Sequence, residues 1–117
     1  MIGDVGIELN DGSPFVLRIS GELDLSNIEM LDEALGRAKD AGKPVLVDLS
    51  ECRFIDTTVL ARLIRAARPQ SNGRPRLAIV HPAPTISKLL ALTGVDQTVP
   101  VVFTLEEGAQ LLHRDSV

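Results

Sequence analysis

The sequence of 117 residues contains no tryptophan, no tyrosine, one cysteine and only two histidines. A lone cysteine excludes an internal disulfide and any metal site built from several cysteines. We interpret Cys52 as a small, half-buried apolar residue at the end of a strand, and not as a nucleophile. His81 and His113 are far apart in the sequence and have no cluster of acids or cysteines around them, so no metal site is expected.

Long apolar runs and a surplus of basic residues are missing as well. No run approaches the roughly 20 apolar residues that span a bilayer, and residues 1–10 lack the basic and apolar regions of a signal peptide. We therefore expect a cytoplasmic protein that does not insert into a membrane. The net charge of −4 and the presence of only three aromatic residues, all phenylalanine, give no support to direct binding of nucleic acid.

One basic stripe does exist. Arg62, Arg65 and Arg68 follow one another at intervals of three along a predicted helix. The simpler interpretation is a solvated helix face, and the alternative is a patch for an acidic protein partner.

Apolar residues that alternate with polar ones open the sequence and predict an antiparallel hairpin with one buried side. The residues on that side are Val5, Ile7 and Leu9 in the first strand and Phe15, Leu17 and Ile19 in the second. Between the strands, Asn10-Asp11-Gly12-Ser13 favours a tight reversal of the chain.

Helical and strand-like segments alternate after Gly21. Ser26 and Glu29 fit a capping box at the start of the first helix, and Thr104 and Glu107 fit another at the start of the last. The other elements are a helix from Thr57 that buries Leu60, Leu63, Ile64 and Ala67, a helix that stops at Gly94, and strands at 45–49, 77–80 and 101–102. This order predicts a single α/β domain over residues 1–117. Its sheet is mixed and mostly parallel, with an antiparallel N-terminal edge hairpin and about four helices.

Functional residues of an open α/β sheet gather where strands end and helices begin. These places are residues 21–26, 50–58, 81–85 and 103–104. None of them carries a glycine-rich phosphate loop or a nucleophile elbow. Asp48 ends a predicted central strand, but no acidic pair follows the first strand to complete a metal-binding phospho-aspartate receiver. We therefore do not expect an enzyme.

The remaining signal is Phe54-Ile55-Asp56-Thr57-Thr58, in which an apolar pair is expected to anchor a loop and polar residues open a helix. The simplest interpretation is that Asp56 or Thr57 is the N-cap. A threonine at an exposed helix start can also carry a phosphate, because the helix dipole and the free N–H groups favour an anion. Phosphate adds about −1.5 to −2 charges. Within a partner's footprint, a penalty of roughly 3 to 4 kcal/mol would weaken binding several-hundredfold.

At these residues the chain resembles the STAS domain, and within that family the bacterial anti-sigma factor antagonists. The resemblance covers nearly the whole chain. Its motifs are Gly21-Glu22-Leu23-Asp24, then Val45-Leu46-Val47-Asp48-Leu49-Ser50 with Phe54-Ile55-Asp56-Thr57-Thr58, and finally Leu89-Leu90-Ala91-Leu92-Thr93-Gly94-Val95. Each motif alone is weak, whereas their order and spacing together are specific.

The resemblance implies a partner-switching role. The unphosphorylated antagonist would bind an anti-sigma factor of the serine/threonine kinase type and so release sigma; phosphorylation by that kinase would break the complex, and a protein phosphatase would restore it. The implied acceptor is Thr57, and the implied partner-binding residues are Glu22, Asp24, Asp56, Thr58 and Val59. No cofactor is implied for this chain, since ATP belongs to the kinase.

The sequence departs from the family at three positions. Thr57 stands where the acceptor is usually serine, and Val59 and Ala61 stand where the family usually has glycine. Because glycine permits the close approach of another backbone, Val59 is expected to weaken or redirect the usual partner contact.

Two other functions stay open. The chain can be a non-phosphorylated STAS subunit of a stress-signalling scaffold or of a transporter complex, or it can be a sensor domain for a nucleotide or another small ligand. A Thr57→Ala change separates the scaffold subunit from the phosphoregulated antagonist, and saturable binding of a ligand by the isolated chain would favour the sensor.

Overall fold

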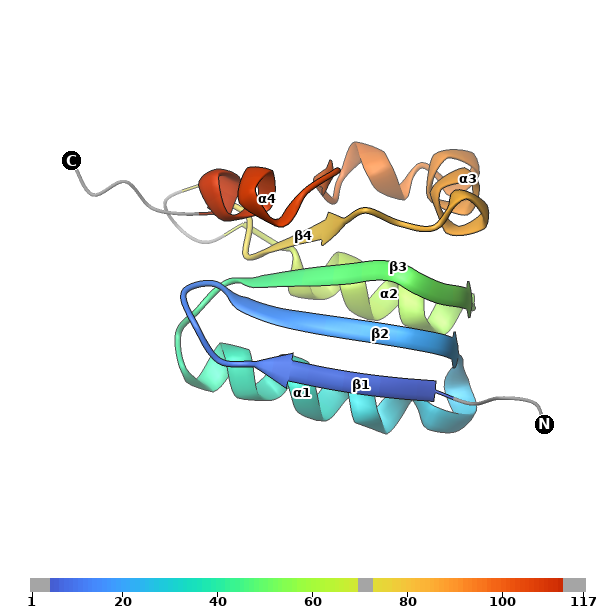
Figure 1. Cartoon of the computed structure of the whole chain (residues 1–117), viewed down its shortest axis with the longest axis horizontal. Coiled ribbons are helices and arrows are strands. Elements are labelled where there is room, and N and C mark those ends of the chain that lie inside the picture. The colour runs from blue at the N-terminus through green and yellow to red at the C-terminus, as the bar shows by residue number, and fades with distance from the viewer. Residues whose placement is uncertain (1–4, 70–72, 113–117) are drawn as a thin grey trace.

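A five-stranded sheet with the order β1-β2-β3-β4-β5 organises the protein (Figure 1). The computed structural model describes residues 5–69 and 73–112, so His113 lies outside the described residues. The strands are β1 (Val5–Asn10), β2 (Phe15–Leu23), β3 (Val45–Ile55), β4 (Leu77–Val80) and β5 (Val101–Val102). β1 pairs antiparallel with β2, and all the other pairs are parallel. The predicted mixed, mostly parallel sheet with its antiparallel edge hairpin is confirmed.

Helices pack on both faces of this sheet. They are α1 (Ile28–Asp40), α2 (Thr57–Ala66), α3 (Pro84–Thr93) and α4 (Leu105–Leu112), with short 3-10 turns η1 (Leu25–Asn27) and η2 (Val95–Gln97). α1 and α2 lie side by side behind the strands in the view of Figure 1. The prediction of about four helices is confirmed for the described residues.

The two faces of β3 belong to two separate hydrophobic clusters. Val47 and Leu49 point into the larger cluster, which α1, α2 and α3 complete. Leu46 points the other way, into a small cluster with Leu112 of α4. Each fully buried side chain of this size contributes about 1.5–3 kcal/mol relative to an exposed one. Because α4 packs on β3, β4 and β5, the same face of β1 and β2 is left to polar side chains.

β3 is longer than predicted. The expected strand ended at Leu49, but pairing with β2 continues to Ile55, so residues 50–55 are not a loop. The register shifts twice on the way, between the Arg18–Asp48 and Ser20–Glu51 pairs and again after Gly21. These bulges interrupt the alternation of apolar and polar residues from which a strand is predicted.

Three side chains differ in burial from the predictions. Cys52 is fully buried inside β3 and not half-buried at a strand end. Phe54 does not anchor a loop to the core, since about half of it (49%) is exposed, and only Ile55 of that apolar pair is buried.

Ile64 was predicted to be buried and is exposed, because it lies at the edge of the stripe formed by Val59 and Leu63.

Helix starts follow the predicted chemistry at two of three places. The last helix has the predicted box, in which Thr104 Oγ1 accepts from the Glu107 N–H (3.0 Å) and Glu107 Oε1 accepts from the Thr104 N–H (3.2 Å). Asp56 is the N-cap of α2, as one of the two predicted alternatives had it. The box of Ser26 with Glu29 is wrong, because Asp24 caps η1 instead and α1 begins only at Ile28.

Candidate functional site

The carboxyl ends of β2 and β3 bring two predicted segments together. Leu23 pairs with Ile55 at the end of both strands, so the residues that follow, Asp24 and Asp56, leave the sheet side by side. A hydrogen bond joins the two segments directly: the Leu25 N–H donates to Asp56 Oδ2 at 3.0 Å. One edge of the sheet therefore carries Thr57 together with four of the predicted partner-binding residues: Glu22, Asp24, Asp56 and Thr58. We call these five residues and the exposed side chains next to them the candidate surface.

The start of α2 has an exposed hydroxyl. Asp56 has an extended backbone, and its Oδ1 accepts from the Val59 N–H at 3.0 Å, which satisfies one of the free donors of the first turn. Thr57 follows as the first helical residue and is exposed, whereas Thr58 is half-buried. The Thr57 side chain can thus be reached from solvent without unfolding of the helix.

A second polar turn faces the start of α2. Asp24 Oδ1 accepts from the Ser26 N–H (2.9 Å) and from the Ser26 hydroxyl (2.5 Å), while Asn27 Oδ1 accepts from the Asp24 N–H (2.8 Å). The Asn27 side-chain amide also donates to the Glu22 carbonyl at 3.1 Å. These bonds hold the β2–α1 connection in one shape, so Asp24 acts as a cap of this turn.

Two exposed apolar side chains on this edge were missed by sequence reasoning. Leu25 is 66% exposed and Phe54 is 49% exposed. Leu25 follows the end of β2, and Phe54 lies next to the last residue of β3. The signal was present in Leu25, an apolar residue inside an otherwise polar turn. Glu22, which lies within β2 and not in a loop, forms an exposed ion pair with Arg53 at 4.0 Å. Exposed apolar residues with charged neighbours are typical of protein-binding surfaces.

Val59 is not part of the candidate surface. Its side chain has 0% exposure and packs in the larger hydrophobic cluster. The prediction that it changes a partner contact is therefore corrected, because a partner cannot touch this side chain while α2 is in place. At this position, where the family usually has glycine, the valine side chain fills part of the core.

The three arginines of the predicted basic stripe do not form one surface. Arg62 Nε donates to Asp32 Oδ1 of α1 at 2.8 Å, so this residue links the two helices. Arg65 is exposed on α2. Arg68, predicted on the same helix, is exposed beyond its end, because α2 stops at Ala66. Only these last two are left for either of the predicted alternatives.

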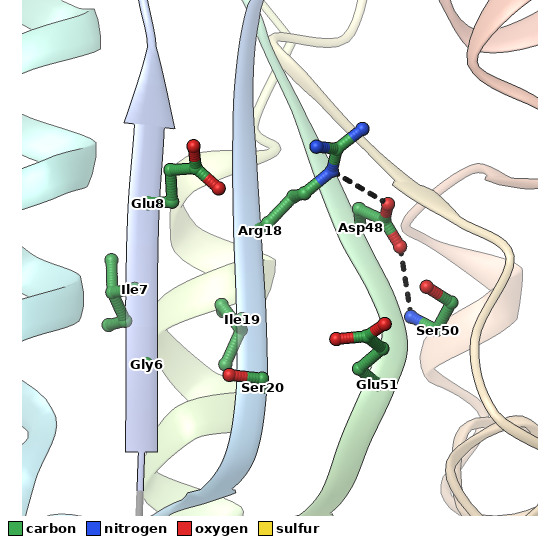
Figure 2. A pocket seen from close by; sticks show the side chains of 9 residues that line it. All are labelled: Gly6, Ile7, Glu8, Arg18, Ile19, Ser20, Asp48, Ser50 and Glu51. Atoms are coloured by element: carbon green, nitrogen blue, oxygen red, sulfur yellow. Dashed lines mark hydrogen bonds and ion pairs between the residues drawn. The ribbon is translucent and has the colours of Figure 1, made fainter.

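A shallow groove of about 470 Å³ lies on the polar face of β1, β2 and β3 (Figure 2). The β3 bulge explains its shape, since it turns Glu51 to the same face as Asp48 and Ser50. The groove is lined by Gly6, Ile7, Glu8, Arg18, Ile19, Ser20, Asp48, Ser50 and Glu51. With three carboxylates and one guanidinium, it favours neutral or cationic groups over phosphates.

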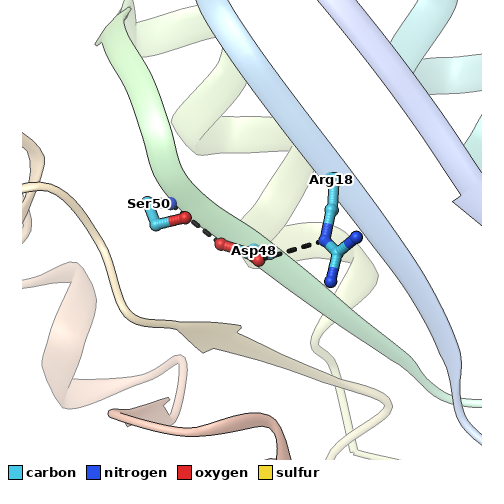
Figure 3. Close-up of polar contacts among 3 residues, drawn as sticks. All are labelled: Arg18, Asp48 and Ser50. Atoms are coloured by element: carbon cyan, nitrogen blue, oxygen red, sulfur yellow. Dashed lines mark hydrogen bonds and ion pairs between the residues drawn. The ribbon is translucent and has the colours of Figure 1, made fainter.

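Two hydrogen bonds fix the Asp48 side chain in the groove (Figure 3). It is only 14% exposed, and its two oxygens accept from the Ser50 N–H (2.9 Å) and from Arg18 Nε (3.4 Å). These bonds explain Asp48 as a structural residue. Within residues 5–69 and 73–112 no group of three potential metal ligands comes together, and the groove therefore offers no metal centre there.

Cys52 is expected to be chemically silent in the folded protein. Burial raises the pKa of its thiol, because the thiolate would lose its hydration, and a backbone hydrogen bond at Phe54 and the nearby Arg53 oppose this only in part. An aromatic disulfide reagent, which releases a coloured thiolate when it reacts with a thiol, should react with Cys52 of the native protein at least about a hundredfold more slowly than with Cys52 of the chain unfolded in concentrated urea. Equal absorbance traces for native and unfolded protein would contradict the burial of Cys52.

Together these features define a small α/β domain with the candidate surface at the carboxyl edge of its sheet. Residues 9–106 match the family model described as "Mlab, STAS domain". The chain belongs to the STAS domain family. No curated protein sequence matches the chain significantly. In the described ranges, every helix is too short or too polar to cross a membrane.

Solved structures share this fold. An anti-sigma factor antagonist from Mycobacterium paratuberculosis superposes with a TM-score of 0.80 at 23% identity, over 93% of this chain and 94% of that chain. The anti-sigma factor antagonist SpoIIAA in its unphosphorylated form gives 0.69 at 20% identity, over 90% and 92%. The Bacillus cell fate determinant SpoIIAA in its phosphorylated form gives 0.62 at 20% identity, over 94% and 100%.

Proposed function

We propose that this chain is a cytoplasmic anti-sigma factor antagonist, a binding module without enzymatic activity, that is switched off by phosphorylation at Thr57. Its partner would be an anti-sigma factor of the serine/threonine kinase type, and a protein phosphatase would reset it. The observation that carries the proposal is the exposed Thr57 hydroxyl at the start of α2, on the edge that also presents Leu25 and Phe54. It is supported by the fold shared with SpoIIAA, which has been solved in phosphorylated and unphosphorylated forms.

Phosphorylation of Thr57 would require only an acceptor hydroxyl from this chain. The Thr57 oxygen attacks the γ-phosphorus of ATP in the kinase; the new bond joins Thr57 Oγ1 to phosphorus, the bond to the bridging oxygen of ADP breaks, and the hydroxyl proton is released. What this chain supplies is an accessible hydroxyl and a helix start that accepts an anion. The phosphate would then stand next to the carboxylates of Asp56 and Asp24. Burying this charge beneath a partner costs desolvation, which opposes the complex.

The alternative functions are less well supported. A nucleotide sensor would need a site for phosphates, but the groove carries Glu8, Asp48 and Glu51. Neither carboxylate of Glu8 and Glu51 has an ion pair among the described residues. Phosphates would therefore be repelled there. A scaffold or transporter subunit without phosphorylation would use the same candidate surface and differs from the main proposal only in the fate of Thr57.

The proposal is tested by intact mass after incubation of the purified chain with ATP and each candidate anti-sigma kinase from the same cell. We expect one phosphate on the wild-type chain, none on Thr57→Ala, and one on Thr58→Ala, the matched control for the neighbouring hydroxyl. A stable complex with a kinase but no phosphate would overturn the switch in favour of a constitutive binder. A phosphate retained in Thr57→Ala would move the acceptor elsewhere.

A further inference from the structure

The Asp56 carboxylate bonds to both sides of the candidate surface. Oδ1 accepts from the Val59 N–H of α2 at 3.0 Å, and Oδ2 accepts from the Leu25 N–H of the β2–α1 connection, also at 3.0 Å. The Leu25 side chain is 66% exposed, so packing against the core contributes little to its position. The hydrogen bond to Asp56 therefore links the Leu25 backbone directly to the start of α2, in addition to the bonds that hold the turn itself.

A phosphate on Thr57 would act on this bond. Thr57 is covalently next to Asp56, and the free N–H groups at the start of α2 attract a phosphate as they attract the Asp56 carboxylate. Two anions of this kind repel each other and compete for the same donors. Of the two Asp56 bonds, the one to Leu25 is exposed and the one to Val59 is partly buried. The exposed bond is the one that competition and water weaken first.

We infer that Asp56 is a positioning residue that couples phosphorylation of Thr57 to the position of Leu25. In the unmodified chain Asp56 ties the Leu25 backbone to the start of α2, with the Leu25 side chain exposed. Phosphate on Thr57 draws the carboxylate off the Leu25 N–H and breaks this link to α2, while the bonds of Asp24 and Asn27 keep the turn itself in shape. The inference rests on the proposed function, because it takes phosphorylation of Thr57 as its signal, but it concerns a change inside the chain alone.

The test therefore needs no kinase and no partner. Phosphothreonine is built into position 57 during protein synthesis, and native-state hydrogen exchange of single amides is followed by NMR. We expect the Leu25 amide to exchange about tenfold faster than in the unmodified chain, as loss of a hydrogen bond to a charged acceptor predicts. The amides of Leu23 in β2 and Val59 in α2 should keep their rates. An unchanged Leu25 rate overturns the inference, and so does an equal acceleration of all three amides.

An Asp56→Ser variant separates positioning from general stability. Serine keeps an acceptor for the N-cap of α2, but its shorter side chain does not reach the Leu25 N–H. Leu25 should exchange as fast in this variant as in the phosphothreonine chain, and phosphothreonine added to the variant should cause no further change. A further change in the doubly altered chain overturns the coupling through Asp56.

The matched control is Thr104→Ala, which removes the N-cap of α4, away from the candidate surface. It should lower stability by a similar amount and leave the Leu25 rate relative to Leu23 as in wild type. Absence of phosphate on Thr57 in the mass experiment would reject the proposed function. An unchanged Leu25 exchange rate in the chain that carries phosphothreonine would reject only the coupling through Asp56, so the two failures are distinguishable.

Discussion

Thr57→Glu is expected to weaken binding of the kinase-type anti-sigma factor by about a hundredfold, while Thr57→Ala binds as tightly as wild type. The glutamate places a fixed negative charge at an exposed helix start beside Asp56, and a bound partner would have to bury it. The penalty of about 2.7 kcal/mol implied by that factor is smaller than the 3 to 4 kcal/mol expected for phosphate, because glutamate carries about half of the charge. Titration calorimetry with the kinase identified by mass measures both constants.

Size and charge are separated by Thr57→Gln, which has the shape of the glutamate variant and no charge. We expect this variant to lose no more than about fivefold in affinity. Gln110→Glu adds the same charge at an exposed position of α4, away from the candidate surface, and should bind as wild type. If Thr57→Gln binds as weakly as Thr57→Glu, the switch is steric and the electrostatic mechanism proposed here is wrong.

Val59→Gly, which restores the glycine usual in the family, is expected to lower the free energy of unfolding by about 3 kcal/mol. The Val59 side chain is fully buried, so its removal leaves a cavity between α2 and the sheet. Glycine inside a helix costs about 1 kcal/mol more. The variant should unfold at a lower urea concentration with an unchanged slope, as measured by circular dichroism.

Two variants divide this effect into its causes. Val59→Ala removes the side chain without the helix penalty and should cost about 2 kcal/mol. Ala61→Gly changes an exposed residue two positions further along α2 and should cost only about 1 kcal/mol, the helix penalty alone. A loss below about 0.5 kcal/mol in Val59→Gly would mean that the core closes over the missing side chain, against the packing described here.

The fold was predictable where one periodicity held throughout an element. The alternation of Phe15, Leu17 and Ile19 predicted β2, and the run from Val45 to Leu49 predicted a strand covered on two faces, as the two hydrophobic clusters confirm. The prediction failed at residues 50–55, where two bulges break the alternation. A bulge depends on the partner strand, and neither its place nor its effect on Glu51 and Phe54 is encoded in local spacing.

The candidate site was predictable in its parts and not in its connections. Asp56 was recognised as a possible cap because an acidic residue before a helical run has a local role. Its second bond, to Leu25, spans 31 positions of the sequence and forms only because β2 and β3 end side by side. The exposure of Leu25 and Phe54 and the burial of Val59 are likewise results of how the elements pack.

By itself, the sequence determined the order of strands and helices, the capping box of α4 and the family to which the chain belongs. These features arise from neighbours within a few residues, through side-chain periodicity and capping. Only the tertiary structure decided that Thr57 is exposed while Val59 is in the core, and that Asp56 reaches across to Leu25. Burial and long-range hydrogen bonds depend on which surfaces meet, and that is settled when the sheet forms and the helices pack on it.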